Sequence, residues 1–295
     1  MSLVSLSAVS QDQVLPLWEG DPPFYVESDE KEYSEVTNIT RIHQVQKPEI
    51  SVFLPRKKSA NGNAVLICPG GGYRILAWDW EGENIGRWFN SKGIAAIVLK
   101  YRLPSPVSQT EPHKVPLTDA QRAMRLVRHH AEEWGINPER TGVMGFSAGG
   151  HLASTLSTHF DAGDPGSTDP VEKQSCRPDF SILMYPVITM ENDYTHRGSR
   201  RNLLGDNPSD EMVEYYSNEK QVSENTPPAI LIHSTDDGGV PVENSLAYYK
   251  ALKDQGISAA MHVYPYGGHG FALAENRGHL ATWTDRVLDW ILYLE

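Results

Sequence analysis

Short apolar runs alternate with amphipathic stretches along this chain, and that alternation constrains the fold more than any other feature of the sequence. The runs at 64–68 and 94–99 are apolar throughout, as strands are when both faces of their sheet are covered. Between them, 81–91 is typical of a helix closed by Gly93, and the apolar residues of 117–134 fall on one helical face. Strands that alternate with helices pair through right-handed crossovers. The sequence therefore predicts an α/β fold with a mostly parallel central sheet and helices on both faces.

The residues that follow each strand matter most in such a fold, because ligands bind outside the carboxyl ends of the strands. After the apolar pair Val143-Met144 comes 145–149, Gly-Phe-Ser-Ala-Gly, which is a G-x-S-x-G motif. Where a strand turns sharply into a helix at this motif, the serine is strained with its Oγ exposed, and the glycines remove side chains that would collide. We therefore expect Ser147 to be a nucleophile, with an ordinary tight turn as the alternative.

A serine nucleophile needs a general base, and the base needs a carboxylate to orient it. Two later predicted strands end next to suitable residues. The strand at 229–233 is followed by Asp236 and Asp237, and the strand at 259–264 is followed by a loop that contains His269. Glycines flank this histidine and leave its loop free to bring the imidazole to the serine. The sequence predicts His269 as the base, and a surface-loop histidine is the alternative.

Three consecutive glycines, 70–72, follow the strand at 64–68. Without a Cβ in the way, their backbone N–H groups can approach a substrate oxygen closely. Together with the N–H of Ala148 they are candidates for an oxyanion hole, in which each donor contributes about 10²–10³ in rate. A flexible turn is the alternative.

Other titratable residues fit structural roles better. His151 is expected to pack or hydrogen-bond within the fold, and His233 is expected to be buried in a strand. Asp79, Glu81 and Glu83 near the glycine loop could pair as acid and base, but a solvated helix start explains them better, because acids favour the first turn. No histidine–carboxylate cluster has metal-ligand spacing, so we predict neither a metal nor another cofactor.

Composition excludes some partners. Lys and Arg total 26 against 38 Asp and Glu, a net charge of −12, which argues against a nucleic-acid binder. No apolar stretch is long enough to span a bilayer, so we expect a soluble protein with no membrane partner. The two cysteines, Cys68 and Cys176, are predicted to be unpaired thiols, and a single bridge is the alternative.

The organisation of the chain suggests one main domain. We expect an N-terminal extension at 1–35, a single domain at 36–295, and an insertion at 185–228 that forms a cap or a wall of the site, with a passive connector as the alternative. The opening ten residues lack a basic residue and are interpreted as a frayed terminus, with a trimmed secretion signal as the alternative. The first interpretation predicts a cytoplasmic protein and the second a secreted or periplasmic one. The oligomeric state stays open.

These residues resemble the α/β-hydrolase superfamily from about Val36 to the end of the chain. More narrowly, they are similar to small bacterial carbohydrate esterases, the acetyl xylan and feruloyl esterases. The resemblance rests on the segments 68–73, 100–103, 145–151, 195–200, 202–205 and 226–228, and on the Asp237 and His269 loops.

The resemblance implies a role for each of six residues. It implies Ser147 as the nucleophile, His269 as the base and Asp237 as its orienting acid, with Gly71, Gly72 and Ala148 as the oxyanion donors. Asp236 is then expected to bond loop N–H groups. The chain departs from related lipases of the H-G-G-G type, which carry a histidine where this sequence has Pro69.

The implied activity is hydrolysis of small acyl esters, most simply acetyl, on a small-molecule or oligosaccharide substrate such as acetylated xylan. A prolyl-oligopeptidase-like exopeptidase is one alternative, because 233–237 also resembles the acid loop of that family, and a non-catalytic binding protein is another. Aromatic or polar side chains near the glycine loop or in the insertion are candidates for substrate contact: Tyr73, Trp78, Trp80, Tyr185 and His196. For the aromatic residues near the glycine loop, packing in the core is the alternative.

Overall fold

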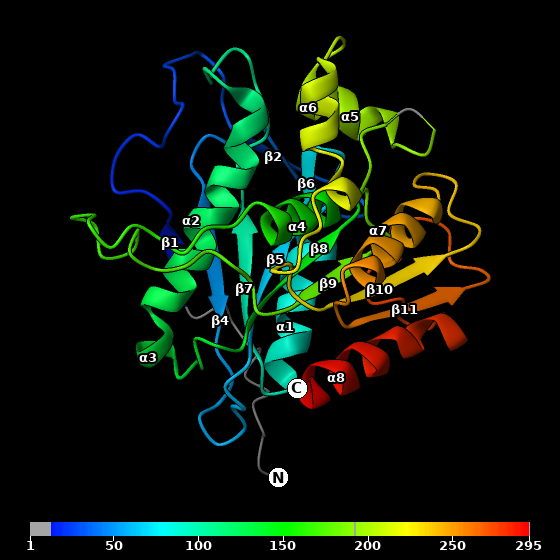
Figure 1. The fold of residues 1–295 in the computed structure, drawn as a ribbon. Helices are drawn as coiled ribbons and strands as arrows, with labels where there is room; N and C mark the ends of the chain where they lie inside the picture. The colour runs from blue at the N-terminus through cyan, green and yellow to red at the C-terminus, as the bar shows by residue number, and fades with distance from the viewer. Residues whose placement is uncertain (1–12, 192, 295) are drawn as a thin grey trace.

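A central sheet of eight strands forms the framework of the protein (Figure 1). The computed structural model describes residues 13–191 and 193–294. The strands lie in the order β1 (Gln13–Pro16), β4 (Glu49–Phe53), β7 (Ala95–Lys100), β5 (Ala64–Cys68), β8 (Thr141–Phe146), β9 (Ser181–Met184), β10 (Ala229–Ser234) and β11 (Ala259–Tyr264). All neighbouring pairs from β7 to β11 are parallel, and β1 and β4 join antiparallel at one edge. The predicted mostly parallel sheet is confirmed.

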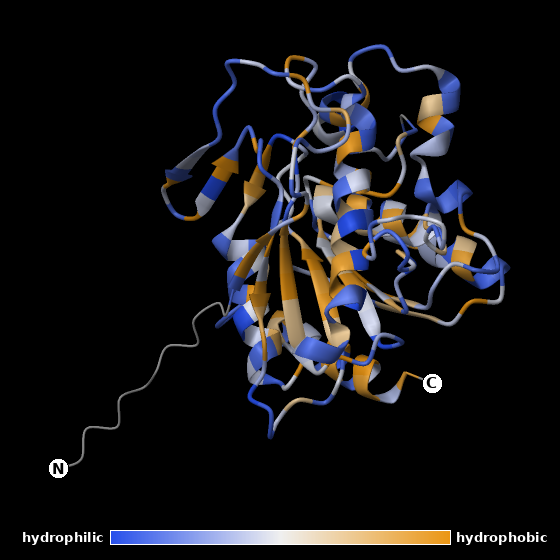
Figure 2. Cartoon of the chain, turned by 90° about the vertical axis from the view of Figure 1, so that its left-hand side faces the viewer, coloured by the Kyte–Doolittle hydropathy of each residue, from blue (hydrophilic) through white to orange (hydrophobic). Residues whose placement is uncertain are grey.

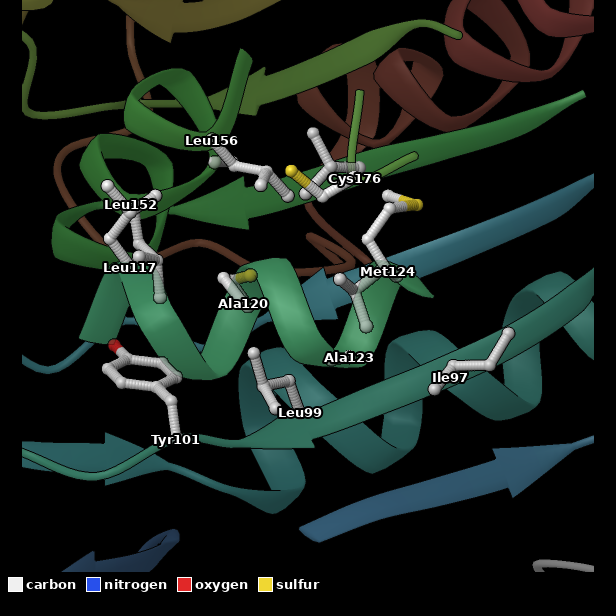
Figure 3. Close-up of a cluster of buried hydrophobic side chains, with 14 of the residues drawn as sticks. Ile97, Leu99, Tyr101, Leu117, Ala120, Ala123, Met124, Leu152, Leu156 and Cys176 are labelled. Carbon is white, nitrogen blue, oxygen red and sulfur yellow. The ribbon is translucent and has the colours of Figure 1, made fainter. Parts of the chain in front are cut away.

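Helices cover both faces of this sheet. Successive strand residues point to opposite faces, so neighbouring residues of one strand pack against different helices. Leu66 of β5 belongs to one buried cluster, with α2 (Val115–His129), α4 (Ala148–Thr158) and α7 (Glu243–Asp254). Its neighbour Ile67 belongs to the other, with α1 (Asn84–Ser91) and α8 (Trp283–Tyr293). Figure 2 shows the inner strands of this sheet largely in the hydrophobic colour, and Figure 3 shows Ala120 and Ala123 of α2 above Leu99 of β7. The small side chains on α2 allow this close approach.

A second, antiparallel sheet supports the glycine loop. It consists of β2 (Tyr33–Val36), β3 (Thr40–His43) and β6 (Ile75–Ala77). Strand β6 follows the glycines almost directly, so its pairing with β3 fixes where the loop ends. A π-helical turn, η1 (Asp79–Glu83), then leads into α1.

The segment between β9 and β10 lies beyond the carboxyl ends of the parallel strands (Figure 1). It carries α5 (Arg197–Leu204), α6 (Asp210–Tyr215) and a short 3₁₀ turn, η3 (Asn218–Lys220). Hydrogen bonds tie it to α4: the His151 ring bonds the Tyr216 carbonyl at 2.8 Å, and the Asn218 amide donates to the Ser154 hydroxyl at 2.7 Å. The function of 185–228 as a cap or wall stays a prediction.

The N-terminal part differs from expectation. Part of the predicted extension at 1–35 belongs to the central sheet and core, which the sequence did not indicate, since β1 pairs with β4 and Leu17 is buried in the core. Short, half-exposed edge strands have too little apolar pattern to be recognised. The division of the chain at 35/36 stays a prediction, and the opening ten residues lie outside the described residues.

Cys68 and Cys176 are both free thiols, as predicted. No helix in the described ranges is long and apolar enough to cross a membrane.

Candidate active site

Ser147 occupies a sharp turn between β8 and α4. Its backbone has φ 53° and ψ −117°, a conformation that L-residues rarely adopt and that costs about 1–3 kcal/mol. The flanking glycines are required sterically. A Cβ on Gly145 would lie 2.0 Å from the Gly149 carbonyl oxygen, and one on Gly149 would lie 2.1 Å from the Cys68 oxygen. The turn therefore holds the serine beyond the end of its strand.

His269 connects Ser147 to Asp237. Its Nε2 lies 2.8 Å from Ser147 Oγ, and its Nδ1 lies 2.7 Å from Asp237 Oδ2. A carboxylate at Nδ1 makes that nitrogen the donor, which leaves Nε2 to accept the hydroxyl proton. The three side chains come from loops after β8, β10 and β11, so the strand order brings together residues far apart in sequence.

Asp237 is held as a carboxylate. Its Oδ1 accepts from the N–H groups of Gly239 and Val240 at 2.8 Å each, and buried His233 lies 3.3 Å from Oδ2. Although burial raises the pKa of Asp237, hydrogen bonds from His233 and His269 hold it well below its usual range. His233 is buried as expected, but its contact with this carboxylate is a feature that the sequence did not indicate.

Asp236 bonds the backbone of the histidine loop. Its Oδ1 accepts from the N–H groups of Gly267 and Gly268, at 2.7 and 2.8 Å. It therefore bonds the loop that carries the histidine, while the histidine itself bonds only the other aspartate of the pair.

The glycine loop faces the same cavity as Ser147. Gly71 and Gly72 have φ +133° and +65°, and a Cβ on Gly71 would lie 2.1 Å from the Ile75 oxygen. Within the described ranges, the backbone N–H groups of Gly71, Gly72 and Ala148 have no hydrogen-bond acceptor. Donors that remain unused beside the Ser147 hydroxyl suit the oxyanion that would develop if this serine attacked an ester.

Glu81 lies beneath this loop and is only 4% exposed. Its Oε2 accepts from the Gly70 N–H at 2.9 Å, and its Oε1 accepts from the Tyr185 hydroxyl at 2.8 Å. Burial raises its pKa, against the opposing effects of Tyr185, His269 and Gly70. The expectation of a solvated helix start is wrong for Glu81, because η1 turns this side chain under the loop. No sequence signal separates it from its acidic neighbours.

Of the five candidate substrate-contact residues, two line the cavity. This cavity has a volume of about 800 Å³, and its lining includes Trp80 and His196 together with Ser147 and His269. The other three residues, Tyr73, Trp78 and Tyr185, do not line it.

The rings of these three residues pack wholly or partly inside the fold, so their role in substrate contact stays a prediction. Tyr73 is 2% exposed and its hydroxyl bonds His151 Nδ1 at 2.8 Å, while fully buried Tyr185 bonds Glu81. Trp78 packs against both buried clusters. In the described part of the chain, no group of three or more His, Cys, Asp or Glu residues is placed to hold a metal ion.

The parallel sheet, the strained serine at a strand-to-helix turn and the histidine and aspartate on later loops define an α/β-hydrolase. The chain belongs to the BD-FAE family, whose model matches residues 50–252. A crystal structure of an acetyl ester-xyloside bifunctional hydrolase from Caldicellulosiruptor lactoaceticus is 39% identical, has a TM-score of 0.84 and aligns over 97% of both chains. The resemblance to carbohydrate esterases and the predicted fold are thereby confirmed.

Two curated relatives match this chain over only part of their own length. An "Acetylxylan esterase" of Xylanibacter ruminicola is 40% identical over 229 residues, which are 76% of this chain and 44% of the relative. An "Endo-1,4-beta-xylanase B" of Butyrivibrio fibrisolvens is 42% identical over 216 residues, 72% of this chain and 33% of the relative. The chain therefore spans less than half the length of these two proteins.

Proposed function

We propose that this protein is a serine carboxylesterase that removes small acyl groups, above all acetyl, from carbohydrate. The observation that carries the proposal is the continuous hydrogen-bonded path from Ser147 Oγ through His269 to Asp237, next to three unused backbone donors. The similarity to proteins named as an acetylxylan esterase and an acetyl ester-xyloside hydrolase supports acetyl as the acyl group and a xylose-based sugar as its carrier.

The geometry suits an acyl-enzyme mechanism. Ser147 Oγ attacks the ester carbonyl carbon while its proton passes to His269 Nε2, and the carbonyl oxygen becomes an oxyanion that the donors of Gly71, Gly72 and Ala148 bind. When the C–O bond breaks, the sugar oxygen takes the proton from His269. A water molecule then gives a proton to the same nitrogen and attacks the acyl carbon, which releases acetate and restores Ser147. Asp237 stabilises the imidazolium in both halves.

The experiment is a panel of substrates measured with wild type and Ser147→Ala. We expect p-nitrophenyl acetate to have a higher kcat/KM than the octanoate, and acetylated xylan to release acetate. Ser147→Ala should lose several powers of ten in kcat while keeping its fold, because the hydroxyl fills no core space. Turnover by the variant within about tenfold of wild type would exclude the serine mechanism.

Further substrates in the panel separate the alternatives. Methyl ferulate tests a larger acyl group, and Gly-Pro-nitroanilide tests the exopeptidase alternative. Hydrolysis of the anilide without hydrolysis of acetate esters would replace the esterase proposal, and inertness toward every substrate would favour a binding protein.

A further inference from the structure

The cavity at Ser147 is cationic, although the protein as a whole is strongly acidic. Three arginines line it, Arg41, Arg74 and Arg201, whereas the chain carries a net charge of −12. The one carboxylate in the lining is Glu81, which is buried and already accepts hydrogen bonds from Gly70 and Tyr185. The positive charge in this cavity is therefore a local arrangement that composition does not explain.

The three arginines come from separate elements that meet at the site. Arg41 lies on β3, Arg74 lies between the glycine loop and β6, and Arg201 lies on α5. Asn202 donates to the Gly72 carbonyl at 2.7 Å, which fixes α5 against the glycine loop. Three segments distant in sequence thus present the same charge to one cavity.

These guanidinium groups are not neutralised within the protein. None of the three makes an ion pair within the described ranges, whereas arginines elsewhere do: Arg102 pairs with Asp119 at 2.6 Å and Arg122 with Asp169 at 2.7 Å.

Each of the three keeps its charge available to a ligand. Arg41 bonds the neutral acceptors Thr37 Oγ1 at 2.5 Å and Asn38 Oδ1 at 3.2 Å, which hold its position without cancelling its charge. Arg74 and Arg201 are exposed. Burial, reinforced by the nearby His269, lowers the pKa of His196, so this other lining residue is neutral at pH 7.

We infer that the sugar part of the substrate carries a carboxylate, so that the enzyme deacylates oligosaccharides bearing a uronic acid. This inference rests on the proposed esterase function. The acetyl group is uncharged and is the part that Ser147 attacks, so an anion that pairs with the arginines must belong to the alcohol side of the ester. A guanidinium binds a carboxylate through two parallel hydrogen bonds, and a cleft of one charge sign concentrates oppositely charged substrates. A neutral xylose chain would leave all three charges unpaired.

The test compares two acetylated xylo-oligosaccharides of equal length and acetylation. One carries a glucuronic acid branch, and in the other that branch is reduced to glucose. For wild type we expect kcat/KM to be about tenfold higher for the acidic substrate, with the difference shrinking as salt is raised. In Arg74→Gln with Arg201→Gln, the ratio of the two kcat/KM values should fall several-fold toward one, because two of the three guanidinium groups that would pair with the carboxylate are lost.

Arg197→Gln is the matched control. Arg197 is exposed on the same helix, α5, but it does not line the cavity. We expect this variant to keep the wild-type ratio and the wild-type rate on p-nitrophenyl acetate.

The outcomes separate the inference from the proposed function. If wild type hydrolyses p-nitrophenyl acetate but treats the acidic and neutral oligosaccharides alike, the inference is overturned and the esterase proposal stands. A preference that persists in the double arginine variant also overturns it. If wild type hydrolyses no ester at all, the proposed function fails and the inference fails with it.

Discussion

Asp236 and Asp237 are adjacent, yet their side chains contact different partners. Asp237 bonds His269 and lies next to His233, whereas Asp236 bonds the N–H groups of Gly267 and Gly268. One residue therefore orients the imidazole, and the other holds the loop on which the imidazole is mounted. The two carboxylates can be distinguished by experiment because only one touches the histidine.

We predict that Asp237→Asn lowers kcat by several hundredfold or more on a saturating acetyl ester. An amide at this position favours the wrong histidine tautomer, a change worth about 10⁴ in a comparable triad. Asp236→Asn should mainly lower the temperature of unfolding and leave kcat much closer to wild type. The reverse ranking, measured on folded proteins, would assign the orienting carboxylate to Asp236.

The placement of side chains at the ends of strands was accessible from sequence, and the placement of a side chain by tertiary contacts alone was not. Ser147 and His269 follow apolar runs, and parallel strands bring such positions to one edge of the sheet. Glu81 lies between two other acids that look identical by pattern. Its burial depends on the Gly70 loop folding back over it and on the approach of Tyr185, which is distant in the chain, so no local rule could separate it.

At the scale of elements, Glu81 joins two loops that need a fixed separation. It holds the glycine loop through the Gly70 N–H and binds the Tyr185 hydroxyl, which in turn accepts from the Ala272 N–H at 3.1 Å. The Tyr185 ring also packs edge-on against His269, with centroids 5.0 Å apart. We therefore expect Glu81 to be a positioning residue that sets the glycine loop relative to the histidine loop.

We predict that Glu81→Gln lowers kcat on p-nitrophenyl acetate more than it raises KM, because it misaligns the reacting groups without removing one. The amide has one acceptor oxygen for two donors, so the free energy of unfolding should fall by about 1–3 kcal/mol. Glu83→Gln is the control, since Glu83 makes only a partly exposed pair with Arg87. Wild-type kcat in Glu81→Gln would contradict the positioning role.

His151 on α4 makes the stability of the fold depend on pH. It is fully buried between the Tyr73 hydroxyl and the Tyr216 carbonyl, and burial lowers its pKa to about 4. As pH drops below about 6.5, His151 becomes protonated in the unfolded chain but stays neutral in the folded chain. The free energy of unfolding therefore falls as pH drops from about 6.5 to 4.

We predict that this one histidine removes up to about 3 kcal/mol of stability between pH 7 and pH 4. Urea unfolding of wild type at a series of pH values measures the total change, to which carboxylates also contribute. His151→Gln removes the histidine's share, so its curve against pH should be flatter between pH 6.5 and 4 by that amount. Parallel curves for the two proteins would show that His151 takes up a proton without unfolding the chain.

At the scale of the whole molecule, the central part of the fold was predictable and the borders were not. Buried strands such as β5 and β7 are apolar throughout, and helix α2 has a clear apolar face, so sequence alone indicates both layers. Strands β1 and β2 are short and half or fully exposed. The partner of β1 is β4, which lies far along the chain, and such long-range pairing is not encoded in a local pattern. Strand β2 pairs with the adjacent β3, but none of its residues is buried, so it has no apolar alternation to mark it.

The strained backbone of Ser147 lowers the stability of the whole chain, while its side chain is the one proposed to carry the activity. Ser147→Gly relieves a strain of about 1–3 kcal/mol at the loss of about 0.5–1 kcal/mol in chain entropy, so we predict a net gain in the free energy of unfolding. Ser147→Ala keeps the Cβ and is the matched control. Urea unfolding should give the glycine variant a higher free energy of unfolding than the alanine variant. Equal free energies of unfolding would mean that the turn is unstrained. A laboratory selection that rewards heat resistance alone will therefore enrich an inactive protein, and any screen for a hardier form of this enzyme has to score turnover at the same time.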